Sequence, residues 1–78
     1  MVTHYYPRAR ACIIHVDEAD LRAGDTVHIH GHTTDYYQRV DRLEWEHEVL
    51  PVARRGRDVA MQVSQRVREG DVVYRLTG

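Results

Sequence analysis

Three histidines occupy alternate positions in one short segment of the chain, at His28, His30 and His32. Alternate residues of an extended strand project from the same face, and a His-x-His pair on a strand is a known way of binding zinc. Solvent-facing strand positions also accept histidine freely, and no cysteine or carboxylate stands at a spacing that would complete a metal site. We therefore expect a solvated polar strand face, with a zinc site made of these three histidines as the alternative.

Other residues offer little catalytic chemistry. Cys12 lies in an apolar run, where a thiol is usually a small buried hydrophobe without thiolate character. Ser64 is not flanked by the glycines of a nucleophile elbow, and Glu44, Glu46 and Glu48 alternate as they would on the outward face of a strand. No glycine-rich phosphate-binding motif is present. We therefore expect no enzymatic activity, no catalytic residue, no cofactor and no bound metal.

Aromatic and basic residues interleave in two segments, 4–8 and 34–39. Such mixtures bind single-stranded RNA, because bases stack on aromatic rings while basic groups contact the phosphates. Tyrosines in these positions also pack into a core or onto the rim of a barrel. Composition alone leaves both interpretations open.

The elements that would position these groups are short strands. Three times a glycine with a closely following aspartate precedes an apolar run, at 24–27, 56–59 and 70–73. Glycine reaches positive φ without steric penalty, and aspartate accepts hydrogen bonds from free turn N–H groups, so each site predicts a turn that leads into a strand. The polar connection 17–24 carries Leu21, which we expect to cover one end of the core.

Alternation of apolar and polar residues predicts which strand faces are buried. The predicted buried sets are Val27 and Ile29; Val59, Met61 and Val63; and Val72, Tyr74 and Leu76. Val40 and Leu43 have opposite parity, and a bulge near 41–42 would return both to the core. About six or seven short strands separated by turn signals favour a closed or nearly closed barrel.

Size and composition limit the architecture and the compartment. With 78 residues, 11 basic and 12 acidic, the chain predicts one domain over 1–78 and no strongly basic arm for nucleic acid. Its single cysteine cannot form an internal disulfide. No leader pattern and no apolar stretch near the length of a membrane span is seen, so we expect a cytoplasmic protein without membrane association.

Several segments resemble known families. Segments 21–29, 40–45, 53–61 and 69–73 resemble the second, β-barrel domain of elongation factor Tu and related translational GTPases. Segments 31–36, 46–47 and 66–74 look like small stand-alone translation-factor-like proteins, which are also similar to the C-terminal barrel of collagenase-type peptidases. The resemblance implies an all-β fold, a small six-stranded antiparallel β-barrel of the translation-factor domain 2 type.

The resemblance and the aromatic and basic residues together give two functional hypotheses. The first is a non-enzymatic module that contacts RNA or a ribonucleoprotein. The second is a protein-interaction domain that docks on an enzyme or GTPase partner. The binding residues expected on the barrel rim are His4, Tyr5, Tyr6, Arg8, His32, Arg66 and Arg68.

Overall fold

The structure is a computed structural model that describes residues 1–76, and these residues form ten short β-strands. The strands are β1 (Val2–Tyr6), β2 (Ala11–His15), β3 (Leu21–Arg22), β4 (Thr26–His30), β5 (Asp35–Arg39), β6 (Leu43–Trp45), β7 (Glu48–Leu50), β8 (Val52–Ala53), β9 (Asp58–Gln62) and β10 (Val72–Arg75). Every strand pair is antiparallel. The all-β class expected from the alternating sequence is confirmed.

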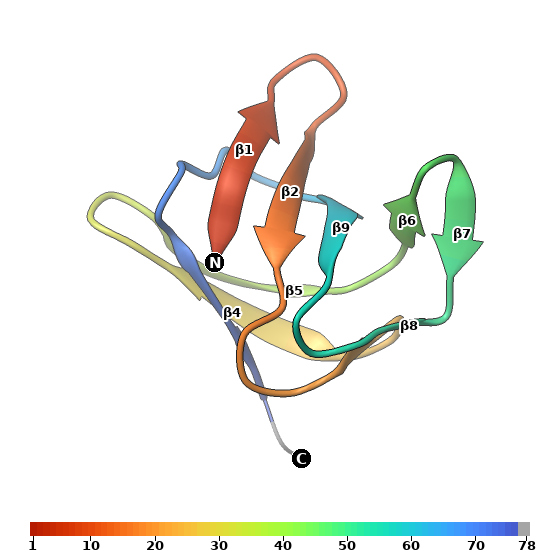
Figure 1. The fold of residues 1–78 in the computed structure, drawn as a ribbon. Helices are drawn as coiled ribbons and strands as arrows, with labels where there is room; N and C mark the ends of the chain where they lie inside the picture. The colour runs from red at the N-terminus through yellow and green to blue at the C-terminus, as the bar shows by residue number, and fades with distance from the viewer. Residues whose placement is uncertain (77–78) are drawn as a thin grey trace.

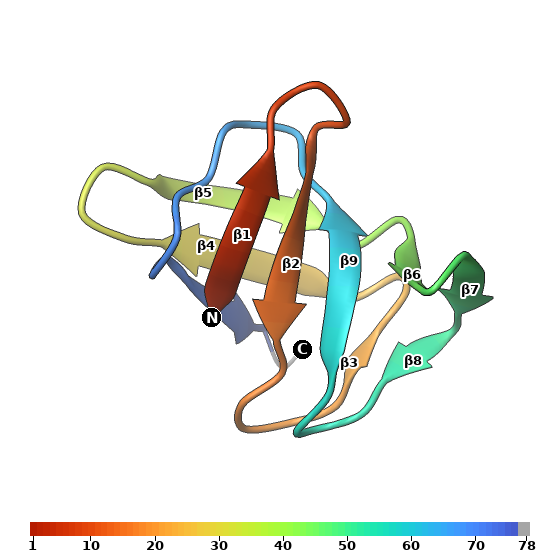
Figure 2. The same cartoon turned by 45° about the horizontal axis from the view of Figure 1, so that its top comes forward.

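The strands fall into three sheets. The largest has the order β1-β2-β9-β6-β7, the second has the order β10-β4-β5, and β3 pairs with β8. The β4–β5 pair crosses behind β1, β2 and β9, so the two larger sheets enclose the core between them (Figures 1 and 2). The expected closed six-stranded barrel is not confirmed, because the strand pairs within residues 1–76 leave the sheets separate.

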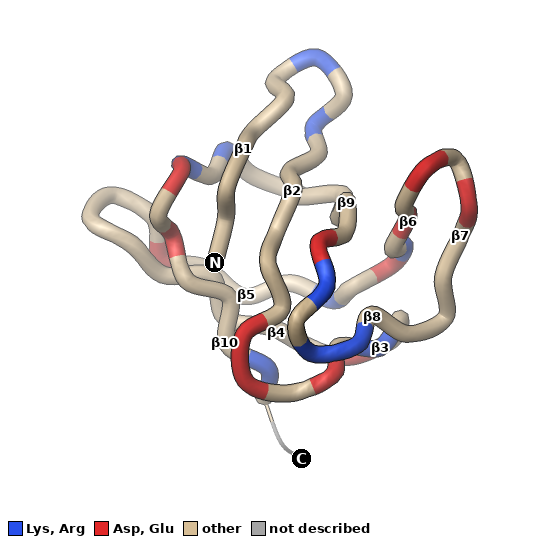
Figure 3. The backbone as a smooth tube through the Cα atoms, in the orientation of Figure 1, with Lys and Arg blue, Asp and Glu red and all other residues tan. Residues whose placement is uncertain are grey.

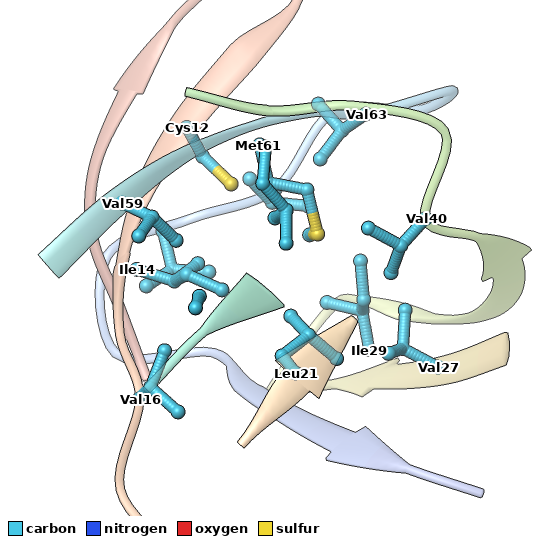
Figure 4. Packing of buried hydrophobic residues seen from close by; sticks show 14 of the residues in the cluster. Cys12, Ile14, Val16, Leu21, Val27, Ile29, Val40, Val59, Met61 and Val63 are labelled. Carbon is cyan, nitrogen blue, oxygen red and sulfur yellow. The ribbon is translucent and has the colours of Figure 1, made fainter. Parts of the chain in front are cut away.

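The core lies between the sheets and is made largely of β-branched residues from alternate strand positions (Figure 4). Val27 and Ile29 of β4 and Val59 and Met61 of β9 are almost completely buried, as the alternation predicts. Leu21 is also buried, so the expected cover over one end of the core is present. Burial of such side chains contributes about 1.5–3 kcal/mol each and is the main source of stability.

The three glycine turns share one hydrogen-bond pattern. Gly24, Gly56 and Gly70 have φ of +97°, +87° and +93°, as the third position of a type II turn requires. In each turn the N–H after the glycine donates to the carbonyl three residues earlier, at 3.0–3.1 Å. The predicted turns are confirmed.

Each turn is also a β-bulge that joins two parts of the fold. The glycine N–H donates to the carbonyl of a buried valine, and that valine's N–H donates to the carbonyl of the residue after the glycine. The partners are Val40 for Gly24, Val16 for Gly56 and Val2 for Gly70. These bonds, at 2.7–2.9 Å, connect segments far apart in the sequence.

The parity change between Val40 and Leu43 is real, but no bulge within a strand makes it. Both residues are fully buried, whereas β5 ends at Arg39 and pairs with β4, and β6 starts at Leu43 and pairs with β7 and β9. The chain therefore turns a corner from one sheet to another. Both side chains reach the core because the corner reorients the strand.

The predicted buried face of β10 is wrong. Tyr74 is 50% exposed and Leu76 is 46% exposed, whereas Asp71 is buried and Val73 packs against the core. Directly paired residues of neighbouring strands share one face of the sheet. Val73 is paired with the buried Ile29, whereas Tyr74 is paired with His28 and therefore lies on the outer face.

Candidate interaction surface

The seven residues predicted to bind RNA or a partner lie on three segments. His4, Tyr5 and Tyr6 are in β1, Arg8 is in the turn after it, His32 is in the β4–β5 turn, and Arg66 and Arg68 are between β9 and β10. His4 and Tyr6 come together, with ring centroids 4.4 Å apart, and Tyr5 packs against the core. Within residues 1–76 no side-chain hydrogen bond or ion pair joins the other four to them. This binding rim stays a prediction.

Basic and acidic residues lie in small separate groups around the molecule, and neither kind covers a large continuous face (Figure 3). Arginines lie on the β1–β2 turn, between β8 and β9, and before β10, whereas acidic residues lie on the β6–β7 hairpin and after β2 (Figure 3). Part of this charge is paired locally: Arg54 contacts the Asp20 carboxylate at 3.0 Å, and the Arg55 N–H donates to the same carboxylate at 2.8 Å. These bonds lower the pKa of Asp20, the Arg55 N–H most. A continuous basic face of the kind that binds nucleic acid is not formed by the described arginines.

The zinc alternative finds no support in the geometry. His28 and His30 lie on one face of β4 with ring centroids 5.6 Å apart, but His32 belongs to the turn that follows Gly31. Among residues 1–76, no three histidine, cysteine or carboxylate side chains are grouped so that they could hold a metal ion.

His28 instead stands at the centre of an exposed aromatic row. Tyr74 of β10 and Tyr37 of β5 are its direct cross-strand neighbours on either side. The rings of His28 and Tyr37 are stacked, with centroids 4.3 Å apart and an interplanar angle of 12°, and Tyr74 lies 6.2 Å from His28. Tyr37 is 62% exposed and Tyr74 is 50% exposed, so this row, Tyr74–His28–Tyr37, presents aromatic surface to solvent across three strands.

A hydrogen bond fixes the orientation of the central ring. His28 Nε2 lies 2.5 Å from Asp35 Oδ1, and Asp35 is on the neighbouring strand β5. The hydrogen bond with His28 lowers the pKa of Asp35 below its ordinary value of 3.8. The ring is thus held by its carboxylate partner while its face stacks on Tyr37.

The sequence contains only part of the signal for this row. Tyr37 alternates with Tyr36, which is buried, so its outward direction follows from the strand period. Tyr74 was assigned to the core, and the pairing of β4 with β10 joins residues that are 46 positions apart (74 − 28). Cross-strand neighbours of this kind are not visible in local patterns.

The one cysteine has the surroundings of a core residue. Cys12 is completely buried in the core, and burial raises the pKa of its thiol from 9.0 to about 12. A thiol with that pKa carries almost no thiolate at neutral pH. The expectation that Cys12 serves packing is confirmed.

No helix in the described part of the chain is both long enough and apolar enough to cross a membrane. No protein-family model matches the sequence.

Curated proteins of two species are similar in sequence. Over 58 residues, 73% of this chain, it is 38% identical to an uncharacterized protease of Methanocaldococcus jannaschii and covers 14% of that protein. Over 73 residues, 92% of this chain, it is 28% identical to a collagenase of Porphyromonas gingivalis and covers 20% of it. The chain therefore corresponds to a fifth or less of the length of these relatives.

A solved structure shows the same fold. The C-terminal domain of a Geobacillus thermoleovorans protein assigned to the U32 peptidases superposes with a TM-score of 0.89 and 19% sequence identity. The match covers 97% of this chain and 88% of that domain. This chain and that C-terminal domain thus share one fold. The expected likeness to collagenase-type peptidases is confirmed, whereas these relatives give no support to the likeness to translation factors.

Proposed function

We propose that this chain is a non-catalytic accessory module that docks on a peptidase unit through the row Tyr74–His28–Tyr37. The observation that carries the proposal is this exposed aromatic row on a fold shared with the C-terminal domain of a U32 peptidase. The proposal retains the hypothesis of a protein-interaction domain and specifies that the partner is a peptidase. In this proposal the partner, and not this chain, hydrolyses peptide bonds.

The physical character of the row suits a protein contact. Tyrosine and histidine rings bury a large area while losing few rotatable bonds, and tyrosine is enriched at the centres of interfaces. The hydrogen bond of His28 with Asp35 and the stacking on Tyr37 order this surface before a partner arrives. Such preorganisation reduces the entropy lost on binding.

RNA contact, the other sequence-based hypothesis, is less well supported. The described arginines are dispersed over several segments (Figure 3), and the similar proteins named above are a protease, a collagenase and a peptidase domain. RNA is therefore kept as an outcome that the experiment can detect.

Photo-crosslinking tests the proposal. A benzoylphenylalanine is placed at Tyr37 in one variant and at Tyr6 in a matched control, since both positions are exposed but lie in different sheets. In a ribonuclease-treated lysate of the source cells, the Tyr37 probe should label a peptidase that mass spectrometry identifies, and the Tyr6 probe should not.

The double substitution Tyr37→Ala and Tyr74→Ala, in protein carrying the probe at His30, should abolish this label. His30 lies beside the row on the same face of β4. In a parallel lysate without ribonuclease, label on RNA that disappears when ribonuclease is added would favour the RNA hypothesis. Equal labelling of the peptidase from Tyr37 and Tyr6 would refute docking through the row.

A further inference from the structure

Strand β10 has an unpaired outer edge. Its inner edge pairs with β4, and the Leu76 N–H donates to the Thr26 carbonyl at 3.0 Å. Hydrogen-bonded residues alternate along an antiparallel ladder, so Tyr74 also faces β4, whereas the backbone groups of Val73 and Arg75 point away from it. Within residues 1–76 no strand pairs with that outer edge.

The free edge borders a slot that continues the line of β1. Met1 exchanges two hydrogen bonds with His15 at the end of β2, both 2.8 Å. The next residue, Val2, forms backbone hydrogen bonds with Gly70 and Asp71, which precede β10. The start of β1 therefore lies between the end of β2 and the start of β10. Beyond Met1 the same space is a cavity of about 210 Å³ lined by 14–19 on one side and 72–75 on the other.

The slot offers hydrogen-bonding groups on both sides. On the β2 side the backbone of Val16 is used by the Gly56 bulge. The next residue, Asp17, makes no backbone hydrogen bond within the described chain, and by alternation its N–H and C=O face the slot. With Val73 and Arg75 opposite, a strand in the slot would find partners along both of its edges.

The side chains around the slot define what such a strand should carry. Ile14, Val16 and Leu21 form an apolar floor, and all three are at least 94% buried. Of the two carboxylates on the rim, Asp17 is paired with the Met1 ammonium at 3.0 Å, whereas Glu18 has no ion pair within residues 1–76. Apolar side chains facing inward and a basic side chain near Glu18 fit this environment.

We propose that this slot binds an extended peptide strand of a partner protein by β-strand addition. The strand lies in line with β1, antiparallel to both β2 and β10, and bonds to the backbone of Asp17, Val73 and Arg75. Its alternate apolar side chains face the floor and a basic one faces Glu18. Main-chain bonds supply affinity and the floor supplies selectivity, as in other domains that bind peptides at a sheet edge. This site does not depend on the docking proposed for the aromatic row.

The probe is a capped peptide with the alternating sequence Val-Arg-Val-Arg-Val-Arg. Hydrogen exchange of backbone amides is followed by NMR with and without saturating peptide. We expect exchange at Val73 and Arg75 to slow by about tenfold or more, because these N–H groups become hydrogen-bonded, with no change at Tyr74. A peptide N-methylated at alternate residues on the edge that faces β10 should give no protection. A peptide with glutamate in place of arginine should bind more weakly.

Two substitutions at one exposed position separate backbone from side-chain effects. Arg75→Pro removes the outward N–H without touching the ladder to β4, and an edge strand tolerates proline there. Arg75→Ala keeps that N–H and removes only the guanidinium, which bonds to the Asp20 carbonyl at 3.1 Å. Peptide affinity should fall about tenfold or more for the proline variant and about threefold or less for the alanine variant.

Three results would overturn the inference. One is an absence of protection at Val73 and Arg75 in the wild-type protein, a measurement that needs no variant to fold. Another is equal protection by the N-methylated peptide. The third is concentration-dependent protection without any peptide, since this would show that the edge of a second copy occupies the slot. None of these results bears on the crosslinking from Tyr37, which tests the docking proposal separately.

Discussion

Gly31 is the glycine whose replacement should be most damaging, because a side chain there would meet a buried carboxylate. A Cβ at this position would lie 1.8 Å from Asp71 Oδ1 and 2.7 Å from its Cγ, far inside the 3.5–4.0 Å of a favourable contact. Asp71 is only 3% exposed, and its other oxygen accepts the Arg68 N–H at 2.8 Å. Moving the carboxylate away from a Cβ at Gly31 would therefore strain or break its hydrogen bond with Arg68.

The cost of Gly31→Ala follows from these contacts. Overpacking in a closed site costs about 1–3 kcal/mol, and losing a hydrogen bond to a charged group costs about 1.5–3 kcal/mol. We expect a loss of about 3–5 kcal/mol in the free energy of unfolding. The total for a chain of 78 residues is roughly 4–12 kcal/mol, so the variant should lose between about a quarter and all of its stability.

Urea denaturation followed by circular dichroism measures this difference. Gly70→Ala is the matched control, because nothing lies within 4 Å of a Cβ there and only the positive φ of +93° opposes the change. Its cost should be about 1–2 kcal/mol. Adding Asp71→Ala to Gly31→Ala should recover part of the loss, since the clashing oxygen is gone. Equal costs for the two glycine variants, or strict additivity with Asp71→Ala, would refute the clash.

Three further predictions concern ionisable and exposed groups. Because Cys12 ionises near pH 9 when unfolded but near 12 when folded, wild-type protein should lose about 1.4 kcal/mol per pH unit above pH 9 relative to Cys12→Ala, visible in denaturation curves at pH 8 and 10.5. Asp35 has a lowered pKa, so its contribution to stability is present above 3.8 and lost as pH falls through the folded value; thermal melts of wild type and Asp35→Asn should differ at neutral pH and converge in acid. Tyr37→Ala and Tyr74→Ala should each change unfolding free energy by about 0.5 kcal/mol or less in urea titrations, as expected for exposed side chains. A pH-independent gap for either ionisable residue, or a large loss at either tyrosine, would contradict the assigned environments.

The local devices of the fold are readable from the sequence. A glycine with positive φ and an aspartate that accepts turn N–H groups were predicted, and the Asp25 and Asp71 carboxylates accept the N–H of Arg22 and Arg68 at 2.8 Å. The middle turn differs, because its fourth residue is Arg57, and the distant Asp20 accepts the N–H of Arg55, the second residue of the turn. The bond to Asp20 joins segments far apart in the sequence, so local chemistry does not predict it.

The pairing of distant segments is what the sequence leaves open. Each turn bonds to a buried valine 16 to 68 positions away, counted from the glycine (40 − 24 and 70 − 2), and nothing local distinguishes Val2, Val16 or Val40 from other valines. The same holds for the outward direction of Tyr74, which follows from its pairing with the distant residue His28. The number and order of paired strands depend on such distant contacts. The sequence predicts a barrel with six strands, whereas the structure has three separate sheets.

The division between turns and exposed edges gives a criterion for assigning function. The N–H groups of Gly24, Gly56 and Gly70 and of the residues that follow them all donate to the valine partners or within the turns, so substitutions of these glycines should act on binding only by lowering stability. The rings of Tyr37 and Tyr74 and the outward N–H of Arg75 contribute little to the folded state, because they face solvent or an empty slot. Loss of binding at unchanged stability is thus expected at these three residues and not at the glycines. Variants of Gly24, Gly56 and Gly70 should bind normally when the temperature is lowered enough to restore their folding. That result would show that the turns lie outside the functional surface.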